Sequence, residues 1–266
     1  MPLTKKHQRI ACLGGIYSNY LALEAALSDI QSQDVDAVFC LGDLGAFGPY
    51  PDRVFPLLEH HKVQCIQGNY DDSIGNQRDD CQCGYTDPRD NYFAQISYEY
   101  TLQNTSDKHR LYLQNLPPQI RLELGHYRVL LCHGSPRKVN EFLWESTTST
   151  HFLSSLCRDF NADVIATTHT GIKWHRRLPH DQHLVNVGAV GRPENDGQNH
   201  VWYTILECKD KQLAVEFMPV HYDFRRLAEE IREEGLPEQF AAALETGWWT
   251  TCLEILPAKE RLRGPH

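Results

Sequence analysis

Hydrophobic residues in the first seventy positions follow two alternating patterns. Short apolar runs occupy 9–13, 37–41 and 63–67, and apolar residues recur every three or four positions over 20–31 and 53–61. The short runs predict buried strands, and the longer periodic segments predict amphipathic helices. Strands that alternate with helices in this way are typical of parallel βαβ units, in which helices cover both faces of a sheet.

The rest of the chain has fewer periodic segments and more short apolar runs. A polar loop with two cysteines and a helical region make up 79–116, and helical periodicity returns over 221–266. Apolar runs between these segments lie at 119–124, 127–132, 163–167, 174–178, 183–187, 201–208 and 212–220. Turn residues separate the last four runs, which predicts a meander. We expect a single domain over 1–266, with 79–116 as an insertion and 221–266 as a helical tail.

The charge of the chain argues against two kinds of partner. It has 26 basic and 35 acidic residues, a formal net charge of −9, which disfavours binding to nucleic acid or to an anionic membrane. No apolar run approaches the roughly 20 residues of a membrane span, and no apolar segment of a secretory signal follows the first residues. Several of the nine cysteines lie in apolar runs, so we expect a reduced, cytoplasmic protein.

Four of the predicted strands are followed closely by a side chain of a type that binds metal ions. These residues are Asp43, Asn69, His133 and His169. Because the carboxyl ends of strands in βαβ sheets open into one crevice, we expect the four side chains to lie together. Each has an ordinary explanation on its own, as a turn, helix-capping or core residue, and only their joint occurrence predicts a site. This mixture of oxygen and nitrogen donors favours Mn, Fe or Zn.

Five segments around these residues carry a family resemblance. They are LGDLGAFGP (41–49), GNYD (68–71), CHGSP (132–136), TTHTG (167–171) and NVGAVG (186–191). In their order they resemble the calcineurin-like metallophosphoesterases, above all the small bacterial phosphodiesterase-like branch with D-x-H-G-N, G-D, G-N-H-D, H-G-S, G-H-T-H and N-P-G-S-V-G. The resemblance implies an α/β fold of the αββα type, with two mixed β-sheets flanked by helices. It also implies two metal ions that share one Asp and activate a hydroxide toward phosphorus.

The resemblance carries over the ligands of the second metal ion but not those of the first. The second set is complete, with a carboxylate at the bridging position: Asp43, Asn69, His133 and His169. The private ligands of the first ion are replaced by Gly15, Tyr17 and Gly171, and Tyr70 stands where the family has a His that assists the leaving group. A phenol with a pKa of about 10 is poorly matched to that task, so efficient two-metal catalysis is not expected.

Two functions remain open from the sequence. The first is a divergent phosphoesterase that keeps one divalent ion (Mn, Fe or Zn) and hydrolyses a phosphorylated small molecule or another phosphoester. Asp43, Tyr70 and Tyr17 are its candidate catalytic residues, and Asn69, Tyr17 and Tyr70 its candidate substrate-binding residues. The second is a non-catalytic descendant that binds a phosphorylated ligand or protein partner, with both tyrosines as hydrophobic fillers. A third interpretation, oxygen-dependent iron chemistry at a two-His, one-carboxylate set, has no other support in the sequence.

Three weaker features have both an ordinary and a functional explanation. Cys81 and Cys83 lie in a polar loop, either as plain loop residues or as a metal-binding or redox-sensitive pair. His175, in a predicted hairpin, is either exposed or reaches the pocket. Trp248 and Trp249 near the C-terminus either pack against the core or mark a surface for a partner.

Overall fold

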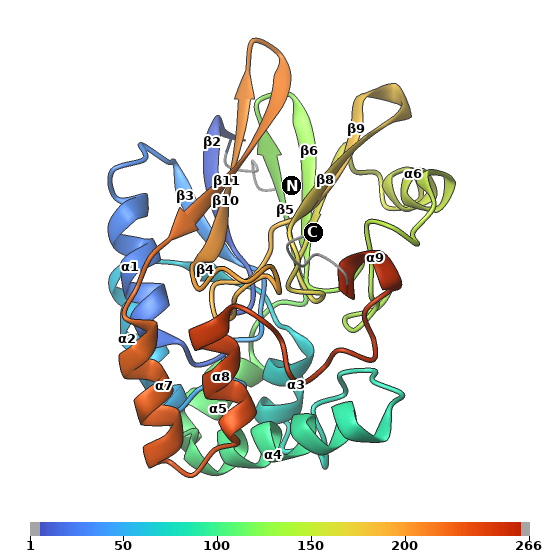
Figure 1. Ribbon diagram of the computed structural model, residues 1–266. Helices are drawn as coiled ribbons and strands as arrows, with labels where there is room; N and C mark the ends of the chain where they lie inside the picture. The colour runs from blue at the N-terminus through green and yellow to red at the C-terminus, as the bar shows by residue number, and fades with distance from the viewer. Residues whose placement is uncertain (1–5, 262–266) are drawn as a thin grey trace.

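Two β-sheets lie face to face at the centre of the protein (Figure 1). The computed structural model describes residues 6–261. The first sheet has the strand order β1 (Lys6–His7), β5 (Gln119–Leu124), β6 (Tyr127–Cys132), β7 (Val164–Thr167), β9 (Gln182–Asn186) and β8 (Trp174–Leu178). The second has the order β11 (Gln212–Val220), β10 (Val201–Lys209), β2 (Arg9–Leu13), β3 (Ala37–Cys40) and β4 (Gln64–Cys65). Both sheets are mixed, because parallel and antiparallel pairs occur in each.

The central strands are apolar on both faces, which explains their unbroken apolar runs. On β2, Ile10 and Cys12 join the core between the two sheets, whereas Ala11 and Leu13 join the core between the second sheet and its helices. Successive side chains of a strand point to opposite faces. A strand buried on both faces therefore shows no alternation in the sequence.

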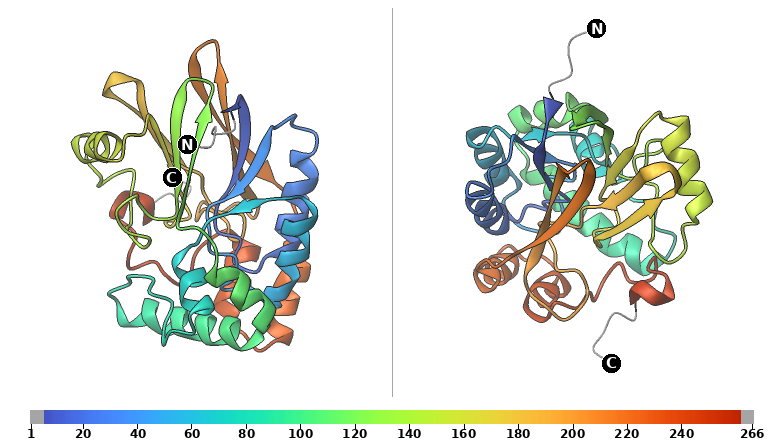
Figure 2. Two further views of the ribbon diagram at one scale, coloured as in Figure 1. Left: turned by 180° about the vertical axis from the view of Figure 1, so that it is seen from behind. Right: turned by 90° about the horizontal axis from the view of Figure 1, so that it is seen from above.

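Helices cover the outer face of each sheet (Figure 2). α1 (Tyr20–Ile30) and α2 (Val54–His60) pack over the second sheet, and α6 (Thr150–Asp159) packs over the first. α1 begins at Asn19, whose Oδ1 accepts a hydrogen bond from the N–H of Ala22 at 3.0 Å, a typical N-terminal cap. The layers run helix, sheet, sheet, helix, which confirms the αββα architecture.

Most of the remaining helices lie beneath the sheets in the view of Figure 1, around the loops that follow the strands. They are α3 (Asn69–Gly75), α4 (Pro88–Asn104), α5 (Asp107–Gln114), α7 (Phe224–Glu233) and α8 (Glu238–Thr246), whereas α9 (Ala258–Arg261) lies at the right of the view, below α6. Two short 3-10 helices, η1 (Pro51–Arg53) and η2 (Pro179–Asp181), complete the described elements. The segment between α8 and α9 runs from the side of α7 toward the side of α6.

The predicted four-stranded meander is wrong, although its four strands are present. β8 and β9 form a hairpin in the first sheet, whereas β10 and β11 form a hairpin in the second. The chain crosses between the sheets after β9, because β10 pairs with β2. Within residues 6–261, no helix combines the length and apolar character needed to cross a bilayer.

Candidate metal centre

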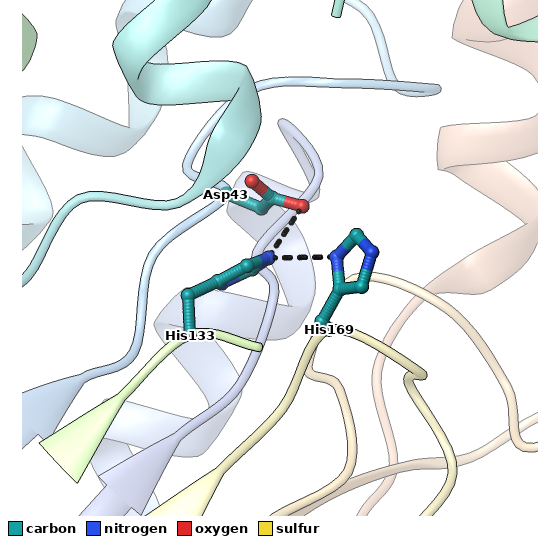
Figure 3. A group of neighbouring side chains, drawn as sticks. All are labelled: Asp43, His133 and His169. Atoms are coloured by element: carbon teal, nitrogen blue, oxygen red, sulfur yellow. Dashed lines mark hydrogen bonds and ion pairs between the residues drawn. The ribbon is translucent and has the colours of Figure 1, made fainter. Parts of the chain in front are cut away.

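Three of the four predicted ligands form one cluster where the ends of the two sheets meet (Figure 3). Asp43 follows β3 of the second sheet, whereas His133 and His169 follow β6 and β7 of the first. Nε2 of His133 lies 3.2 Å from Oδ2 of Asp43 and 3.1 Å from Nδ1 of His169. One ligand atom from each of the three lies within 4.8 Å of the others. Packing of one sheet against the other therefore builds the cluster from distant parts of the chain.

The tautomer of His133 is set by a backbone neighbour. Its Nδ1 lies 2.6 Å from the carbonyl oxygen of Leu41. Because a carbonyl can only accept, Nδ1 carries a hydrogen and donates it. In a neutral imidazole, Nε2 then presents a lone pair to the Asp43 carboxylate and to His169. Lone pairs on these three atoms repel one another at such distances, unless a proton or a metal ion lies between them.

The donor set fits a divalent metal ion. Two nitrogen or oxygen ligands of one ion at about 2.1 Å are about 3.0–3.4 Å apart, from octahedral to tetrahedral angles, and the separations of 3.1 and 3.2 Å around His133 fall in that range. Asn69, the fourth predicted ligand, precedes Tyr70, whose N–H donates to Asp43. Nδ2 of Asn69 donates to the carbonyl of Cys81 at 2.8 Å, while its buried Oδ1 has no hydrogen-bond partner within residues 6–261. A buried oxygen without a donor is costly, and a metal ion would remove that cost.

Backbone hydrogen bonds fix the position of Asp43. Its Oδ1 accepts from the N–H of Tyr70 at 3.1 Å, at the start of α3. The carboxylate of Asp71 accepts from the N–H groups of Gly68, Asp43 and Leu44 at 2.8, 2.7 and 2.9 Å. Asp71 therefore ties the loop after β3 to the loop after β4. Our sequence reasoning missed it, although its place in GNYD, three residues into a helix, is typical of a capping carboxylate.

The charges of the cluster support one another. Burial alone would raise the pKa of Asp43, but the neighbouring His133 lowers that pKa below its ordinary value. Burial alone would lower the pKa of His133, but Asp43 raises it above the ordinary value. Burial and then the positive charge of His133 lower the pKa of His169 to about 3. In the metal-free protein, His133 therefore carries the proton of the cluster, and His169 is neutral.

We expect the affinity for Mn²⁺ to increase with pH. The ion must displace the proton of His133, whose pKa lies above the ordinary value of 6.5. The Kd should therefore fall about tenfold per pH unit below that pKa and level off above it. Titration calorimetry in buffers of different ionisation enthalpy should show release of about one proton per ion. A Kd that does not change between about pH 5.5 and pH 6.5 would contradict the assigned proton.

Gly15 and Tyr17, two of the positions where the resemblance implies ligands of a first metal ion, are packed against each other. A Cβ atom at Gly15 would lie 2.4 Å from Cζ of Tyr17, so the tyrosine ring occupies the space that an Asp side chain at 15 needs. The ring also makes an edge contact with Phe47, with centroids 5.4 Å apart. Gly171 has a φ of +68°, a conformation that favours glycine. Tyr17 thus acts as a filler here and also lines a cavity beside His169.

The Tyr70 hydroxyl is engaged by α4. It donates to the carbonyl oxygen of Ala94 at 3.2 Å or to Oγ of Ser97 at 3.1 Å, and the side chain is buried. The phenol therefore has partners away from the three clustered ligands. Tyr70 contributes its backbone N–H to the site, through the hydrogen bond to Asp43.

Cys81 and Cys83 form a disulfide, which corrects the expectation that all cysteines are reduced. The disulfide loop contacts Asn69, the fourth predicted ligand, whose Nδ2 lies 2.8 Å from the carbonyl of Cys81 and 3.5 Å from Sγ of Cys83. It therefore orients Oδ1 of Asn69. The other seven cysteines carry free thiols.

Trp249 packs inward, in agreement with the ordinary explanation, whereas Trp248 is half-buried. Trp249 is 7% exposed, and its Nε1 donates to the carbonyl oxygen of Pro193 at 2.6 Å. Trp248 packs against Gly197. Trp249 lines the small cavity beside His169 together with Tyr17 and Arg192. His175, by contrast, interacts with His183, with Nε2 2.9 Å from Nδ1 of that residue.

Comparison with known proteins places this geometry in a family. Residues 8–211 match the calcineurin-like phosphoesterase superfamily domain. The chain is 27% identical over 253 residues to an uncharacterized protein of Methanocaldococcus jannaschii, covering 90% of this chain and 98% of that protein. A crystal structure of a metallophosphoesterase from Sphaerobacter thermophilus has 28% identity and a TM-score of 0.68, covering 91% of this chain and 99% of that chain. A hypothetical protein from Pyrococcus horikoshii shares the fold, with a TM-score of 0.77, 20% identity and coverage of 92% and 100%.

Two sheets covered by helices, with carboxylate and imidazole groups gathered at their common end, make this an α/β protein of the αββα type with a candidate metal site. The family match covers residues 8–211, which is most of the chain. The chain belongs to the calcineurin-like phosphoesterase superfamily. This confirms the resemblance carried by the five motifs.

Proposed function

We propose that the protein is a phosphoesterase that works with one divalent metal ion bound through Asp43, Asn69, His133 and His169. The observation that carries this proposal is the environment of His133. The carbonyl of Leu41 accepts a hydrogen bond from Nδ1–H of His133. Nε2 of His133 therefore faces a carboxylate oxygen and a second imidazole nitrogen. Membership in the calcineurin-like phosphoesterase superfamily supports phosphoester chemistry at this cluster.

The packing around Gly15 supports one metal ion rather than two. The ring of Tyr17 fills the space that a ligand side chain at 15 needs, and Gly171 carries no donor. Asp43 therefore lacks a second set of ligands to bridge to. Mn, Fe and Zn all suit the remaining oxygen and nitrogen donors.

Each residue of the cluster has a separate task in the proposed reaction. When bound, the ion supplies a Lewis acid for a phosphoryl oxygen and an activated water. The N–H of Tyr70 and His133 keep the Asp43 carboxylate ionised and oriented. The carbonyl of Leu41 orients His133, and the disulfide loop orients Asn69. Tyr17 lines the cavity beside His169, where its phenol can donate to a phosphoryl oxygen.

The environment of Tyr70 supports a preference for substrates with acidic leaving groups. Its hydroxyl is bonded to α4, so it does not replace the His that protonates the leaving group in the family. General acid catalysis typically contributes about 10²–10⁴-fold. An ester whose leaving group is a stable phenolate depends least on general acid catalysis. We therefore expect aryl phosphoesters to be hydrolysed faster than alkyl phosphoesters.

The test is hydrolysis of aryl and alkyl phosphomonoesters and phosphodiesters with Mn²⁺ and with chelator. We expect turnover that requires metal and falls at least about 100-fold in His133→Ala. His183→Ala is the matched control, because His183 is also buried and paired with an imidazole, but outside the cluster. Wild-type turnover that survives chelation, or equals that of His133→Ala, would sink the proposal. The same rate with and without oxygen would exclude the iron interpretation.

A second candidate function is binding of a phosphorylated ligand or protein partner without hydrolysis. The observations that favour it are the Tyr17 ring in the space that a ligand side chain at 15 needs and the Tyr70 hydroxyl held by α4, which leave the cluster without a second ion or a general acid. Metal-dependent binding of inorganic phosphate without turnover of any ester would identify this function.

A further inference from the structure

Arg192 is a buried cation beside the metal centre. It follows the segment NVGAVG (186–191), and only 8% of its surface is exposed. Its guanidinium stacks on Trp249, with Cζ 3.9 Å from the ring centroid, and lies 5.1 Å from the centroid of Phe47. Nη2 donates to the carbonyl oxygen of Thr251 at 2.8 Å. Its contacts thus include two aromatic rings and one neutral carbonyl.

The charge of Arg192 has no counter-ion in the described part of the chain. No carboxylate between residues 6 and 261 forms an ion pair with it at 4.0 Å or less. A guanidinium has five N–H donors, always charged, in a fork that matches two oxygens of one phosphate. Buried charges are normally paired, because an unpaired one loses its hydration without compensation. An anion is therefore the missing partner.

The place of Arg192 indicates which anion. Arg192 lines the cavity beside His169 together with Tyr17 and Gly171, two of the three positions at which first-metal ligands are replaced. A second small cavity, toward α7 and α8, shares Tyr17, Phe47 and Arg192 with the first. Arg192 thus lines the space next to His169, near two positions where the resemblance implies ligands of a first metal ion.

We infer that Arg192 binds the phosphoryl oxygens of the substrate and supplies positive charge in place of the absent first metal ion. This inference rests on the proposed function, since it names the residue that holds the phosphoryl group at the same site. The ligand class is an oxyanion with a terminal or bridging phosphoryl group. The inference makes Arg192 a substrate-binding residue that sequence reasoning did not identify.

The structure also shows what an incoming phosphate must displace. Each cavity offers about 20 Å³, enough for about one water molecule but not for a phosphate group. Trp249 and Thr251 cover the guanidinium from the C-terminal segment. The Thr251 carbonyl is a neutral acceptor, and a phosphate oxygen forms a stronger, charge-assisted hydrogen bond with the same donor. When a phosphate oxygen replaces the Thr251 carbonyl as the acceptor for Nη2, the C-terminal segment that carries Thr251 must move. Phosphate binding is therefore coupled to displacement of this segment.

The experiment is calorimetric titration of inorganic phosphate into Mn²⁺-loaded protein, after the metal content of each variant has been measured. We expect Arg192→Met to keep its Mn²⁺ and to bind phosphate at least about tenfold more weakly than wild type. Arg89→Met is the matched control. Arg89 also donates to the same segment, from Nη2 to the carbonyl of Thr250 at 2.8 Å, and also lies over an aromatic ring, that of Phe93. It should bind phosphate like wild type.

The outcomes separate this inference from the proposed function. Wild-type phosphate affinity in a folded, Mn²⁺-loaded Arg192→Met protein overturns the inference and leaves the one-metal site standing. Arg192-dependent phosphate binding by a wild type that takes up no metal supports the inference and defeats the proposed function. If Arg192→Met does not fold, Arg192→Gln keeps a donor for the Thr251 carbonyl without the charge, and it should show the same loss. An equal loss in Arg89→Met also overturns the inference, because it assigns the effect to the C-terminal segment.

Discussion

Replacing His133 with alanine is expected to abolish stoichiometric binding of Mn²⁺. The substitution removes the nitrogen that lies 3.2 Å from Asp43 and 3.1 Å from His169, and so takes the central donor out of the set. Loss of residues that merely orient a ligand costs about 10–100-fold in metal affinity. Loss of the ligand itself should cost at least as much. Metal analysis after treatment with chelator, reloading and gel filtration measures the effect.

His183→Ala provides the control for this substitution. His183 is 3% exposed and interacts with another imidazole, so its loss imposes a similar local change without touching the cluster. It should retain about one ion per chain, as wild type does. Unchanged metal content in His133→Ala would remove the site as assigned, since none of the remaining donors replaces Nε2.

The second large effect is expected when the ligands of the first metal ion are restored together. The triple variant Gly15→Asp, Tyr17→His, Gly171→His should bind close to two ions per chain. Tyr17 must change with Gly15, because its ring lies 2.4 Å from a Cβ atom at that position. Gly15→Asp alone should therefore lower the free energy of unfolding by about 1–3 kcal/mol, as overpacking does.

Gly171 limits how well the restored site forms. Its φ of +68° makes any other residue strained, at about 1–2 kcal/mol. A Cβ there meets its first neighbour, the ring of Trp249, at 3.7 Å, which is an ordinary contact. Steric room is thus available, and the backbone is the main cost. A control that opens the same space without ligands, Tyr17→Ala with Gly171→Ala, should stay at one ion. A triple variant that also stays at one ion would mean that residues 15, 17 and 171 do not converge on a second site.

Features that depend on local pattern could be predicted from the sequence. Ala37–Cys40 and Val164–Thr167 are strands because they are short apolar runs, half-buried or buried in the first and fully buried in the second. The approach of Asp43, His133 and His169 followed from the rule that strand ends in such sheets share a crevice. Neither inference required knowledge of which distant segments touch.

Features that depend on contacts between distant segments could not be predicted. Arg192 contacts Trp249 and Thr251, which are distant in the sequence, and no residue near 192 predicts that contact. The disulfide between Cys81 and Cys83 was not predicted, because the one-residue spacing of the two cysteines is not typical of a known kind of site. The turn residues between β9 and β10 look alike whether the next strand stays in its sheet or crosses to the other. The predicted meander failed at that point.

Tyr17 also shows why the replacement of a ligand His by Tyr has two possible interpretations in a sequence. The same side chain fills the space at Gly15 and lines the cavity that contains Arg192 and His169. A tyrosine in place of a ligand His is therefore both a filler and a phenol at the proposed substrate site. The sequence alone does not distinguish these roles, because they share one position.

The measurement that tests the one-metal centre most directly is the anomalous difference density of crystals grown with Mn²⁺, collected near the manganese absorption edge. The structure predicts one peak per chain, in contact with Asp43, Asn69, His133 and His169. Two peaks flanking Asp43, or a peak that does not touch His133, would contradict the centre proposed for this protein.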